Sequence, residues 1–331
     1  MNYLEKYDLW IKQENLDPRI EEELIKMTDQ EKKEAFAIDR EFGTGGMRGI
    51  LGAGTNRLNI YIIRKATYGF GMWLKAQSDN PSCVIAYDNR HYSKEFSVET
   101  AKVLASMGIR AYVTPDLRPT PYLSYAVREL HATGGVMITA SHNTKEYNGY
   151  KIYDCEGCQL VPRLADQVIE NINSIEDIFS IDTESNPSLI NTVSEDIDEK
   201  YMEMVKEISL RNDEKNIKVV YTPLHGTGSV FAPKILRQLG YDVVCVEEQM
   251  VHDPDFSSVT SANPENTQAF DKAIELGKEV GADILLANDP DADRLGIAPL
   301  HNGKYVLLTG NQTAAVIFKY LLENTKVIPE N

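Results

Sequence analysis

The sequence predicts an α/β protein built from two related three-layer domains with mixed, largely parallel sheets. Short apolar runs that resemble buried strands alternate with longer amphipathic stretches, and this alternation occurs twice along the 331 residues. The second series repeats the strand–loop–helix–strand order of the first, although few residues are identical between them. Such alternation is typical of sheets that carry helices on both faces.

A helical extension precedes the first series. An apolar stripe that includes Leu4 and Trp10, and the acidic helix start Asp29-Gln-Glu-Lys, predict helices within the first forty residues. A glycine cluster, Phe42-Gly-Thr-Gly-Gly-Met-Arg-Gly49, follows. The elements expected after it are a helix over 60–77, a strand over 82–87, a helix over 94–107, and strands over 109–114 and 135–139.

The alternation weakens over 172–196, where Asn, Ser, Asp and Glu dominate, and this stretch is interpreted as a linker or domain boundary. We therefore expect a first domain over 1–200, a second over 201–308 and the start of a truncated third domain over 309–331. The elements expected in the second and third domains are strands over 217–221, 242–246 and 283–287 and helices over 230–239, 266–280 and 311–322.

Composition excludes several classes of function. The net charge of −16 argues against nucleic acid or an anionic membrane surface as the main partner. No apolar run approaches the roughly 20 residues that cross a bilayer, and the first residues have no signal-peptide character. Four scattered cysteines suit a reducing compartment. We expect a cytoplasmic protein and favour a monomer. Despite its negative charge, the protein can hold a phosphate ester where basic groups converge.

A lone serine occupies an informative position in Thr139-Ala-Ser-His-Asn143. This run follows the apolar stretch over 135–139 and leads into Tyr147-Asn-Gly-Tyr-Lys151. A small hydroxyl at the end of a buried strand is a common place for a nucleophile, because the scaffold fixes it while the loop presents it. From these residues alone, an ordinary polar turn explains the motif equally well.

Three alternating aspartates, Asp289, Asp291 and Asp293, directly follow another apolar strand. Crowded carboxylates repel one another, and binding of Mg²⁺ relieves the repulsion. Arg294 beside them is placed to pair with a phosphate that bridges to the metal. An EF-hand is excluded because Arg294 and Leu300 stand where that loop needs Gly and Glu. A haloacid-dehalogenase-type phosphatase is disfavoured by Asp293, and a solvated acidic turn remains the alternative.

Four other motifs carry less information. Cys155-Glu-Gly-Cys158 lacks a second pair, which favours a structural role. His225-Gly-Thr-Gly228 lies between a strand and a helix, but the third glycine of a dinucleotide loop is absent. Asp88-Asn-Arg90 and Thr120-Pro121 are interpreted as loop-shaping residues, and for Arg90 a surface or packing role is favoured over a contact with the site.

The glycine cluster, the serine loop with Tyr147-Asn-Gly-Tyr-Lys151, the His225 loop and the aspartate loop occur in the order of the α-D-phosphohexomutase superfamily. The chain resembles its phosphoglucomutase members most, including the branch similar to phosphopentomutases, from about Leu4 to its end. Each motif alone is weak, whereas four in order with matching separations are specific. Thr144 departs from the family's usual Ser-His-Asn-Pro pattern without removing a reacting group.

This resemblance implies roles for single residues. Ser141 matches the serine that carries the phosphoryl group and transfers it to the sugar. The implied Mg²⁺ ligands are the phosphate on Ser141 together with Asp289, Asp291 and Asp293. The residues implied to contact the reacting phosphate are Arg48, Lys151 and Arg294, with His142 and Asn143 belonging to the serine loop.

The implied reaction interconverts glucose 1-phosphate and glucose 6-phosphate through glucose 1,6-bisphosphate, which also activates the enzyme. Phosphopentomutase and phosphomannomutase activities of the same superfamily stay open, as does a non-catalytic fragment that binds metal and phosphate. The family has four domains, and its sugar-selecting loop and distal phosphate site would lie beyond residue 331. We therefore expect an N-terminal fragment with little turnover by itself.

Overall fold

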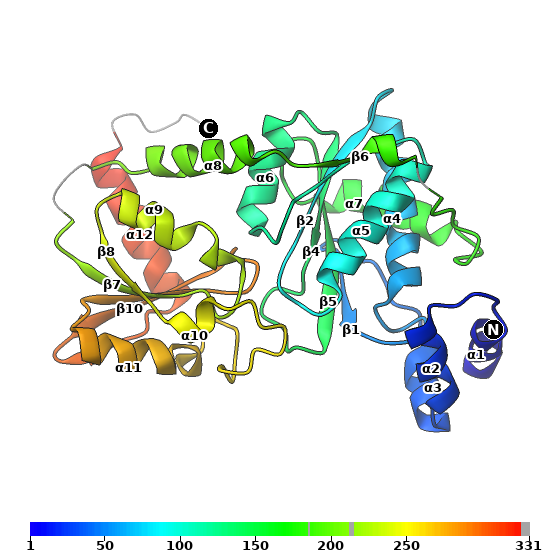
Figure 1. The fold of residues 1–331 in the computed structure, drawn as a ribbon, viewed down its shortest axis with the longest axis horizontal. Coiled ribbons are helices and arrows are strands. Elements are labelled where there is room, and N and C mark those ends of the chain that lie inside the picture. Colours follow the sequence, from blue (N-terminus) through cyan, green and yellow to red (C-terminus); the bar gives the residue numbers. More distant parts are fainter. Residues whose placement is uncertain (185, 212–214, 326–331) are drawn as a thin grey trace. The chain divides into compact units, whose positions relative to one another are not determined.

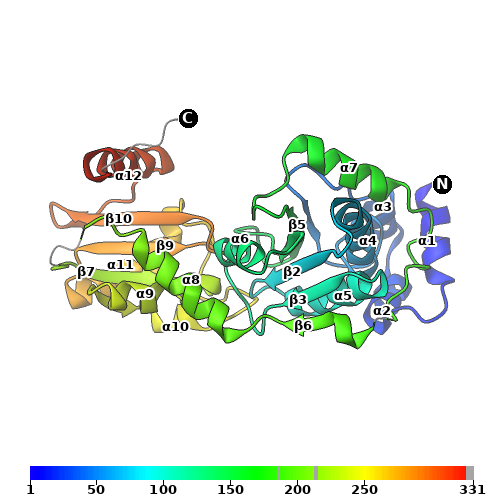
Figure 2. The same cartoon turned by 90° about the horizontal axis from the view of Figure 1, so that it is seen from above.

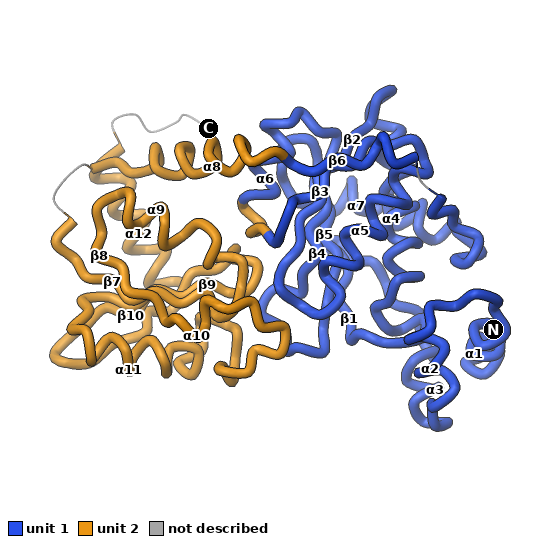
Figure 3. Tube along the Cα trace, viewed as in Figure 1, with its two compact units in different colours: residues 1–117, 122–193 blue, residues 118–121, 194–331 orange. Residues whose placement is uncertain are grey.

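The computed structural model describes residues 1–184, 186–211 and 215–325, and the chain forms two compact units (Figure 3). One unit comprises Met1–Leu117 and Tyr122–Val193, and the other comprises Arg118–Pro121 and Ser194–Asn331. Both units combine helices with a sheet, as the sequence predicts. Among the described residues, no helix is long and apolar enough to cross a membrane.

The first unit contains a six-stranded sheet in the order β1-β5-β4-β2-β3-β6 (Figure 1). Strands β4, β2, β3 and β6 are parallel, whereas β5 pairs antiparallel with both β4 and β1. The strands span Met47–Ile50 (β1), Ser82–Tyr87 (β2), Arg110–Val113 (β3), Gly134–Ile138 (β4), Tyr147–Tyr153 (β5) and Ile190–Thr192 (β6).

Helices cover both faces of this sheet. A Cβ atom added to Gly134 would meet Phe70 and Leu74 of α4, whereas one added to Gly135 would meet Leu123 and Val127 of α6. Successive strand residues point to opposite faces, so α4 and α6 form the two outer layers. The covering helices are α4 (Ile60–Gln77), α5 (Ser93–Ser106), α6 (Thr120–Glu129) and α7 (Pro162–Asn173).

The N-terminal extension forms three helices around a core that it shares with Tyr61 of α4, and these helices are α1 (Tyr3–Ile11), α2 (Pro18–Lys26) and α3 (Asp29–Phe36). Trp10 and Phe36 are buried and meet edge to face, with ring centroids 5.7 Å apart. Capping boxes at Asn2 and Thr28 satisfy the first backbone N–H groups of α1 and α3.

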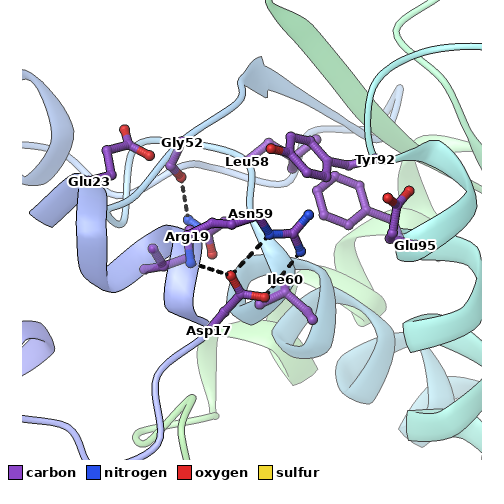
Figure 4. Close-up of a pocket in the computed structure, with 11 residues that line it drawn as sticks. Asp17, Arg19, Glu23, Gly52, Leu58, Asn59, Ile60, Tyr92 and Glu95 are labelled. Carbon is purple, nitrogen blue, oxygen red and sulfur yellow. Dashed lines mark hydrogen bonds and ion pairs between the residues drawn. The ribbon is translucent and has the colours of Figure 1, made fainter.

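The second of these helices docks on the start of α5 through a charged and aromatic contact (Figure 4). The Arg19 guanidinium lies over the Tyr92 ring, 4.7 Å from its centroid, and Arg19 Nη2 pairs with Asp17 Oδ2 at 3.1 Å. A small pocket of about 60 Å³ lies there, with Glu23 and Glu95 on its wall.

The second unit contains a five-stranded sheet in the order β11-β10-β9-β7-β8. On one face, Val220 and Leu285 belong to the same core as Ala273 of α11; on the other, Val219 and Tyr221 pack with helix α9. The elements are α8 (Glu195–Glu207), β7 (Lys218–Thr222), α9 (Ala232–Gln238), β8 (Asp242–Cys245), α10 (Glu247–Met250), α11 (Asp271–Val280), β9 (Ile284–Asn288), β10 (Leu295–His301), β11 (Lys304–Tyr305) and α12 (Gly310–Asn324). Single 3-10 turns occur at Pro187–Leu189, Thr227–Ser229 and Thr267–Phe270.

The two sheets repeat one topology. The series β5-β4-β2-β3 corresponds to β10-β9-β7-β8, and both series have one antiparallel pair followed by two parallel pairs. Consequently the serine loop, which follows β4, and the aspartate loop, which follows β9, occupy equivalent places in the two units. Figure 2 shows both sheets with their helices.

The stretch over 172–196 contains the division between the two units, at Val193 and Ser194, but it also holds regular structure that a linker would lack. Its strand β6 pairs in parallel with β3 at the sheet edge, with Tyr112 opposite Asn191. The strand is too short and polar to show a period in the sequence. Helix α8 then crosses residue 200, the expected boundary, so we propose that the second domain starts at this helix. Ser185 of the stretch, and residues 326–331 of the expected third domain, lie outside the described residues.

Candidate active site

Ser141 lies at the end of β4 in a left-handed backbone conformation, with φ of 54°. Its N–H donates to Thr139 Oγ1 at 2.7 Å, and the Asn143 N–H closes a turn on the Ala140 carbonyl at 3.1 Å. A residue with a Cβ atom rarely adopts this conformation, and such outliers concentrate at functional sites. The Ser141 Oγ lies 3.3 Å from His142 Nδ1.

The buried side chain of Arg90 binds the backbone of the serine loop. The guanidinium donates hydrogen bonds to the carbonyl oxygens of Ser141 at 2.7 Å, Thr144 at 2.8 Å and Tyr147 at 3.0 Å. A fourth bond, to the Asn143 carbonyl, completes the set. The planar fork of an arginine suits several carbonyl groups at once. The backbone of the loop is therefore fixed by a single side chain.

Asp88 balances the charge of this buried arginine. Asp88 Oδ2 lies 3.4 Å from Arg90 Nε, and Asp88 Oδ1 accepts hydrogen bonds from the Arg90 N–H and the Ser93 hydroxyl. Burial raises the pKa of Asp88, and the charge of Arg90 opposes this increase. The pair is an internal support for the loop. Of the surface or packing role favoured from the sequence for Arg90, the structure shows a buried side chain, which also contacts the serine loop.

Strand register places Arg48 and Lys151 on one face of the sheet. Arg48 is opposite Gly149 in the β1–β5 pair, and Lys151 lies two residues after Gly149 on β5. Residues two apart on a strand share a face. Arg48 Nη1 donates to Asn143 Oδ1 at 3.0 Å, which connects this face to the serine loop. Gly149 is required, because a Cβ there would lie 2.4 Å from the Thr139 carbonyl oxygen.

The aspartate loop of the second unit gathers three carboxylates. Asp289, Asp291 and Asp293 each offer an oxygen within 4.8 Å of the others. Asp289 and Asp291 are fully buried, whereas Asp293 is exposed. The Arg294 N–H donates to Asp289 Oδ1 at 3.0 Å, and its guanidinium lies 4.0 Å from Glu265 Oε1. Two buried carboxylates and one exposed carboxylate fit a hard cation that is open to a further oxygen ligand.

Thr120 fixes the middle carboxylate. Its N–H donates to the Asp291 carbonyl oxygen at 2.8 Å, and its hydroxyl donates to Asp291 Oδ2 at 3.0 Å. Arg118, two residues earlier, forms a two-point ion pair with Asp198 of α8, with Nη2–Oδ2 at 2.6 Å and Nε–Oδ1 at 3.1 Å. Hydrogen bonds from outside the ligand set commonly orient metal ligands.

The loop after β7 supports the aspartate loop from the other side. Thr227 donates to the Pro290 carbonyl oxygen from its N–H at 2.8 Å and from its hydroxyl at 3.0 Å. Gly226 packs so closely that an added Cβ would lie 2.3 Å from the Pro290 Cα atom. Asn288 Nδ2 donates to the Arg294 carbonyl oxygen at 2.7 Å and thereby closes the far end of the loop.

Comparison with known proteins identifies the fold. Residues 39–178 match phosphoglucomutase/phosphomannomutase alpha/beta/alpha domain I, and residues 199–302 match domain II of the same family. The chain belongs to the phosphoglucomutase/phosphomannomutase family. It is the family whose motifs the sequence resembles, so the predicted superfamily and fold class are confirmed.

Individual relatives agree with this assignment. A phosphoglucomutase from Staphylococcus aureus strain MRSA252 is 40% identical over 323 residues, which are 96% of this chain and 58% of the relative. A protein from Thermus thermophilus, assigned as a phosphomannomutase, is 25% identical with a TM-score of 0.72 over 87% of this chain and 62% of its own. A Burkholderia thailandensis family member, 20% identical over 84% of this chain and 58% of its own, shares the fold with a TM-score of 0.69.

The first of these relatives is much longer than the chain described. The chain spans a little under three fifths of that curated phosphoglucomutase, at 58%. Activity, substrates and partners of a whole family member are therefore proposals for this chain.

Within this family member, the first unit brings Arg48 and Asn143 into contact beside Ser141 and His142, and it places Lys151 on the same face as Arg48. The second unit brings the three aspartates together with the Arg294 backbone. Cys155 and Cys158 are free thiols on the surface, as a structural role allows.

Two contributors, Arg90 and Thr120, were not recognised from the sequence as parts of the site, and the loop His225-Gly-Thr-Gly228 was recognised as a family motif without a role. Arg90 and the His225 loop follow β2 and β7, and each of these strands lies next to the strand that carries the functional loop. This position in the chain, directly after such a strand, is the signal that could have identified them, because the carboxyl ends of neighbouring parallel strands meet at one edge of the sheet. The partner of Thr120, by contrast, is 171 residues away along the chain.

Proposed function

We propose that this chain provides the phosphoryl-transfer groups of a phosphoglucomutase, which interconverts glucose 1-phosphate and glucose 6-phosphate. The observation that carries the proposal is the serine loop: Ser141 is held in a left-handed conformation by Arg90 after a buried strand. The identity of 40% with a phosphoglucomutase supports this choice of sugar.

In the proposed reaction, Ser141 carries a phosphoryl group. A sugar hydroxyl oxygen attacks the phosphorus, the bond from phosphorus to Ser141 Oγ breaks, and glucose 1,6-bisphosphate forms. The bisphosphate then reorients and returns its other phosphoryl group to Ser141. Transfer of this kind depends on in-line positioning and on neutralising the non-bridging oxygens more than on covalent chemistry by the protein.

The residues proposed for neutralisation are Arg48, Lys151 and Arg294, with His142 and Asn143 lining the phosphate. Arg48 is already oriented by its hydrogen bond to Asn143, and Lys151 is only 4% exposed. A buried ammonium acts in a medium where attraction to phosphate is stronger than in water. These side chains would bind and orient the phosphoryl group while it moves.

The proposed metal ligands are Asp289, Asp291 and Asp293, with the phosphate on Ser141 as the further ligand that the family resemblance implies. Mg²⁺, when bound, supplies positive charge to the phosphoryl oxygens. The protein groups that prepare this place are Thr120, which fixes Asp291, and Thr227, which fixes the Pro290 carbonyl.

Mannose 1-phosphate is the second candidate substrate, because the similar Thermus thermophilus protein is assigned as a phosphomannomutase. The sequence resemblance leaves two further alternatives: a pentose phosphate as the substrate, and a metal- and phosphate-binding role without turnover. The deciding experiment is a coupled assay with glucose 1-phosphate, mannose 1-phosphate and ribose 1-phosphate. It is run on a chain of the relatives' full length, and the highest kcat/KM is expected for glucose 1-phosphate.

We further propose that residues 1–331 by themselves turn over slowly, since they span 58% of the phosphoglucomutase that they resemble. Contacts with remote parts of a substrate normally supply orientation at the reacting centre. The same assay on residues 1–331 tests this. A kcat/KM within about tenfold of the longer chain, a difference of roughly 1.4 kcal/mol in barrier, would contradict it.

A further inference from the structure

A second pocket lies in the first unit, with a volume of about 740 Å³. This volume is within the range of small-molecule sites. Its wall is formed by the N-terminal extension, the segment before β1, helix α4, and the end of α7 with the chain that follows it. Residues 1–38 of the extension lie outside the two matched family domains, which begin at residue 39.

The floor of the pocket is apolar and partly aromatic. Trp10 and Phe42 are buried and line it, together with Ile62 of α4 and Ile172 of α7. Leu9 and Ile38, which also line it, leave 45% and 66% of their surface exposed. An apolar floor with exposed apolar edges favours a ligand with an apolar body.

Two ammonium groups face this floor. Lys6 is neutralised by Asp39, with Nζ–Oδ1 at 2.6 Å. Lys65, on α4, is half-buried, and among the residues that the structure describes its ammonium has no hydrogen bond and no ion pair within 4.0 Å. Burial lowers the pKa of Lys65; attraction to Asp39 opposes this decrease, and repulsion from Lys6 adds to it.

The carboxylates around the pocket do not neutralise Lys65. Glu41, Glu176 and Asp177 line the pocket, but all three are exposed, so their charges are hydrated at the rim. A partly desolvated cation that has only the more distant Asp39, already paired with Lys6, gains from an incoming anion, because a charge-assisted hydrogen bond forms where little hydration is lost. Cations inside and hydrated carboxylates outside therefore favour an anionic head group that reaches the interior.

We propose that this pocket binds a small amphiphilic anion, a carboxylate or a phosphate monoester with an apolar body, whose head group pairs with Lys65. The proposal concerns binding alone, so it does not depend on the phosphoryl transfer proposed above. The pocket lies next to a proposed phosphate-binding residue. Met47, which directly precedes Arg48, lines the pocket, and Arg40 Nη1 donates to the Arg48 carbonyl oxygen at 3.3 Å. An occupant would contact the strand that carries a proposed phosphate-binding residue.

The test is a fluorescence titration with 8-anilinonaphthalene-1-sulfonate, an aromatic anion, on wild type, Lys65→Met and Lys75→Met. Lys75 is an exposed lysine of the same helix whose ammonium bonds the Met107 carbonyl, so its replacement is the matched control. We expect Lys65→Met to lower the affinity for the dye at least about tenfold, as loss of a charged hydrogen bond would. Lys75→Met should bind the dye as tightly as wild type does. Equal affinity in wild type and Lys65→Met would overturn the proposal.

A charge pair at Leu9 keeps the test independent of Lys65. Because Leu9 is partly exposed, we expect both Leu9→Glu and Leu9→Lys to fold. Thermal unfolding of the two variants would verify this. An anion site predicts weaker dye binding in Leu9→Glu than in Leu9→Lys, and the same affinity in both would contradict it. Octanoate, octyl phosphate and octanol would then compete with the dye. The stronger of the two anions identifies a carboxylate or a phosphate head group, and octanol should compete more weakly than either. Octanol competing as well as the anions would overturn the proposal.

Discussion

At Ser141 the backbone holds a conformation that costs a residue with a Cβ atom of the order of 1 kcal/mol. The hydrogen bonds from Arg90 to the carbonyl oxygens of Ser141, Thr144 and Tyr147 stabilise it. Because Asp88 is buried beside Arg90, removing either charge would leave the other without compensation. The orientation of the proposed nucleophile therefore depends on a residue pair about fifty positions earlier in the chain.

Arg90→Lys should keep the positive charge beside Asp88 but lose most of the carbonyl bonds, because an ammonium has no planar fork. We expect the free energy of unfolding to fall by about 3 kcal/mol and phosphorylation of Ser141 to slow. Chemical denaturation and peptide mass spectrometry would measure the two effects. Arg110→Lys, at an exposed position of β3, is the control. An unchanged Ser141 phosphorylation rate in Arg90→Lys would refute the positioning role.

The aspartates should differ in what they contribute to Mg²⁺ binding. We expect Asp291→Asn to weaken binding most, because Asp291 is buried and oriented, and exposed Asp293→Asn to weaken it less. Thr120→Val removes the hydroxyl that bonds Asp291 Oδ2, and an approximately tenfold loss of affinity is expected. Calorimetric titration gives all three values. If Asp291→Asn binds Mg²⁺ as tightly as wild type, Asp291 is not a ligand of the metal.

At the scale of the elements, the duplicated topology explains the arrangement of the loops. In each unit the loop after one parallel strand, β2 or β7, supports the functional loop after the neighbouring strand, β4 or β9. Arg90 does this with a guanidinium, whereas Thr227 and Gly226 do it with hydrogen bonds and close packing. The same architecture thus supports the proposed nucleophile in one unit and the three carboxylates in the other.

Gly226→Ala tests this support in the second unit. The added methyl group would collide with the Pro290 backbone, so the aspartate loop must shift. We expect Mg²⁺ affinity to fall by about tenfold or more, with the far-UV spectrum unchanged. Gly310→Ala is the matched control, because its methyl group would find its nearest atom, Glu265 Oε1, at 3.4 Å. A wild-type Mg²⁺ affinity in Gly226→Ala would show that the loop does not depend on this packing.

Helix α8 is predicted to respond to alkaline pH through Tyr201. This buried side chain packs on Phe231, with ring centroids 5.2 Å apart, and burial raises its pKa from 10.0 to about 12. A raised pKa favours the neutral hydroxyl in the folded state, so its stabilisation is complete below pH 10 and is lost as the pH rises toward 12. Between pH 9 and pH 11, wild type should lose roughly 1.4 kcal/mol more stability than Tyr201→Phe. Parallel denaturation curves for the two proteins would contradict this.

For the whole molecule, much of the fold was predictable from the sequence. The helix over 60–77 and the strand over 82–87 lie where their patterns place them, because both are strongly apolar and Asn59 caps the helix. Strand β6 and helix α8 were not predicted. The first is a polar edge strand, and the second buries only Ile197, Tyr201 and Met202 on a largely acidic helix.

The candidate site was predictable for a different reason. Ser141 and the three aspartates stand in short motifs whose order carries the resemblance, whereas Arg90 and Thr120 act through contacts with residues far along the chain. A spacing pattern cannot show that a guanidinium turns toward carbonyl groups about fifty residues later. The supporting residues therefore required the structure.

The most direct test of this account is whether Ser141 accepts a phosphoryl group. The chain would be incubated with glucose 1,6-bisphosphate and Mg²⁺, then measured by intact mass and peptide mapping. We predict one added phosphoryl group on the peptide that contains Ser141, and none there in Ser141→Ala. Phosphate on another residue, or the same mass increase in Ser141→Ala, would contradict the assignment of Ser141 as the nucleophile.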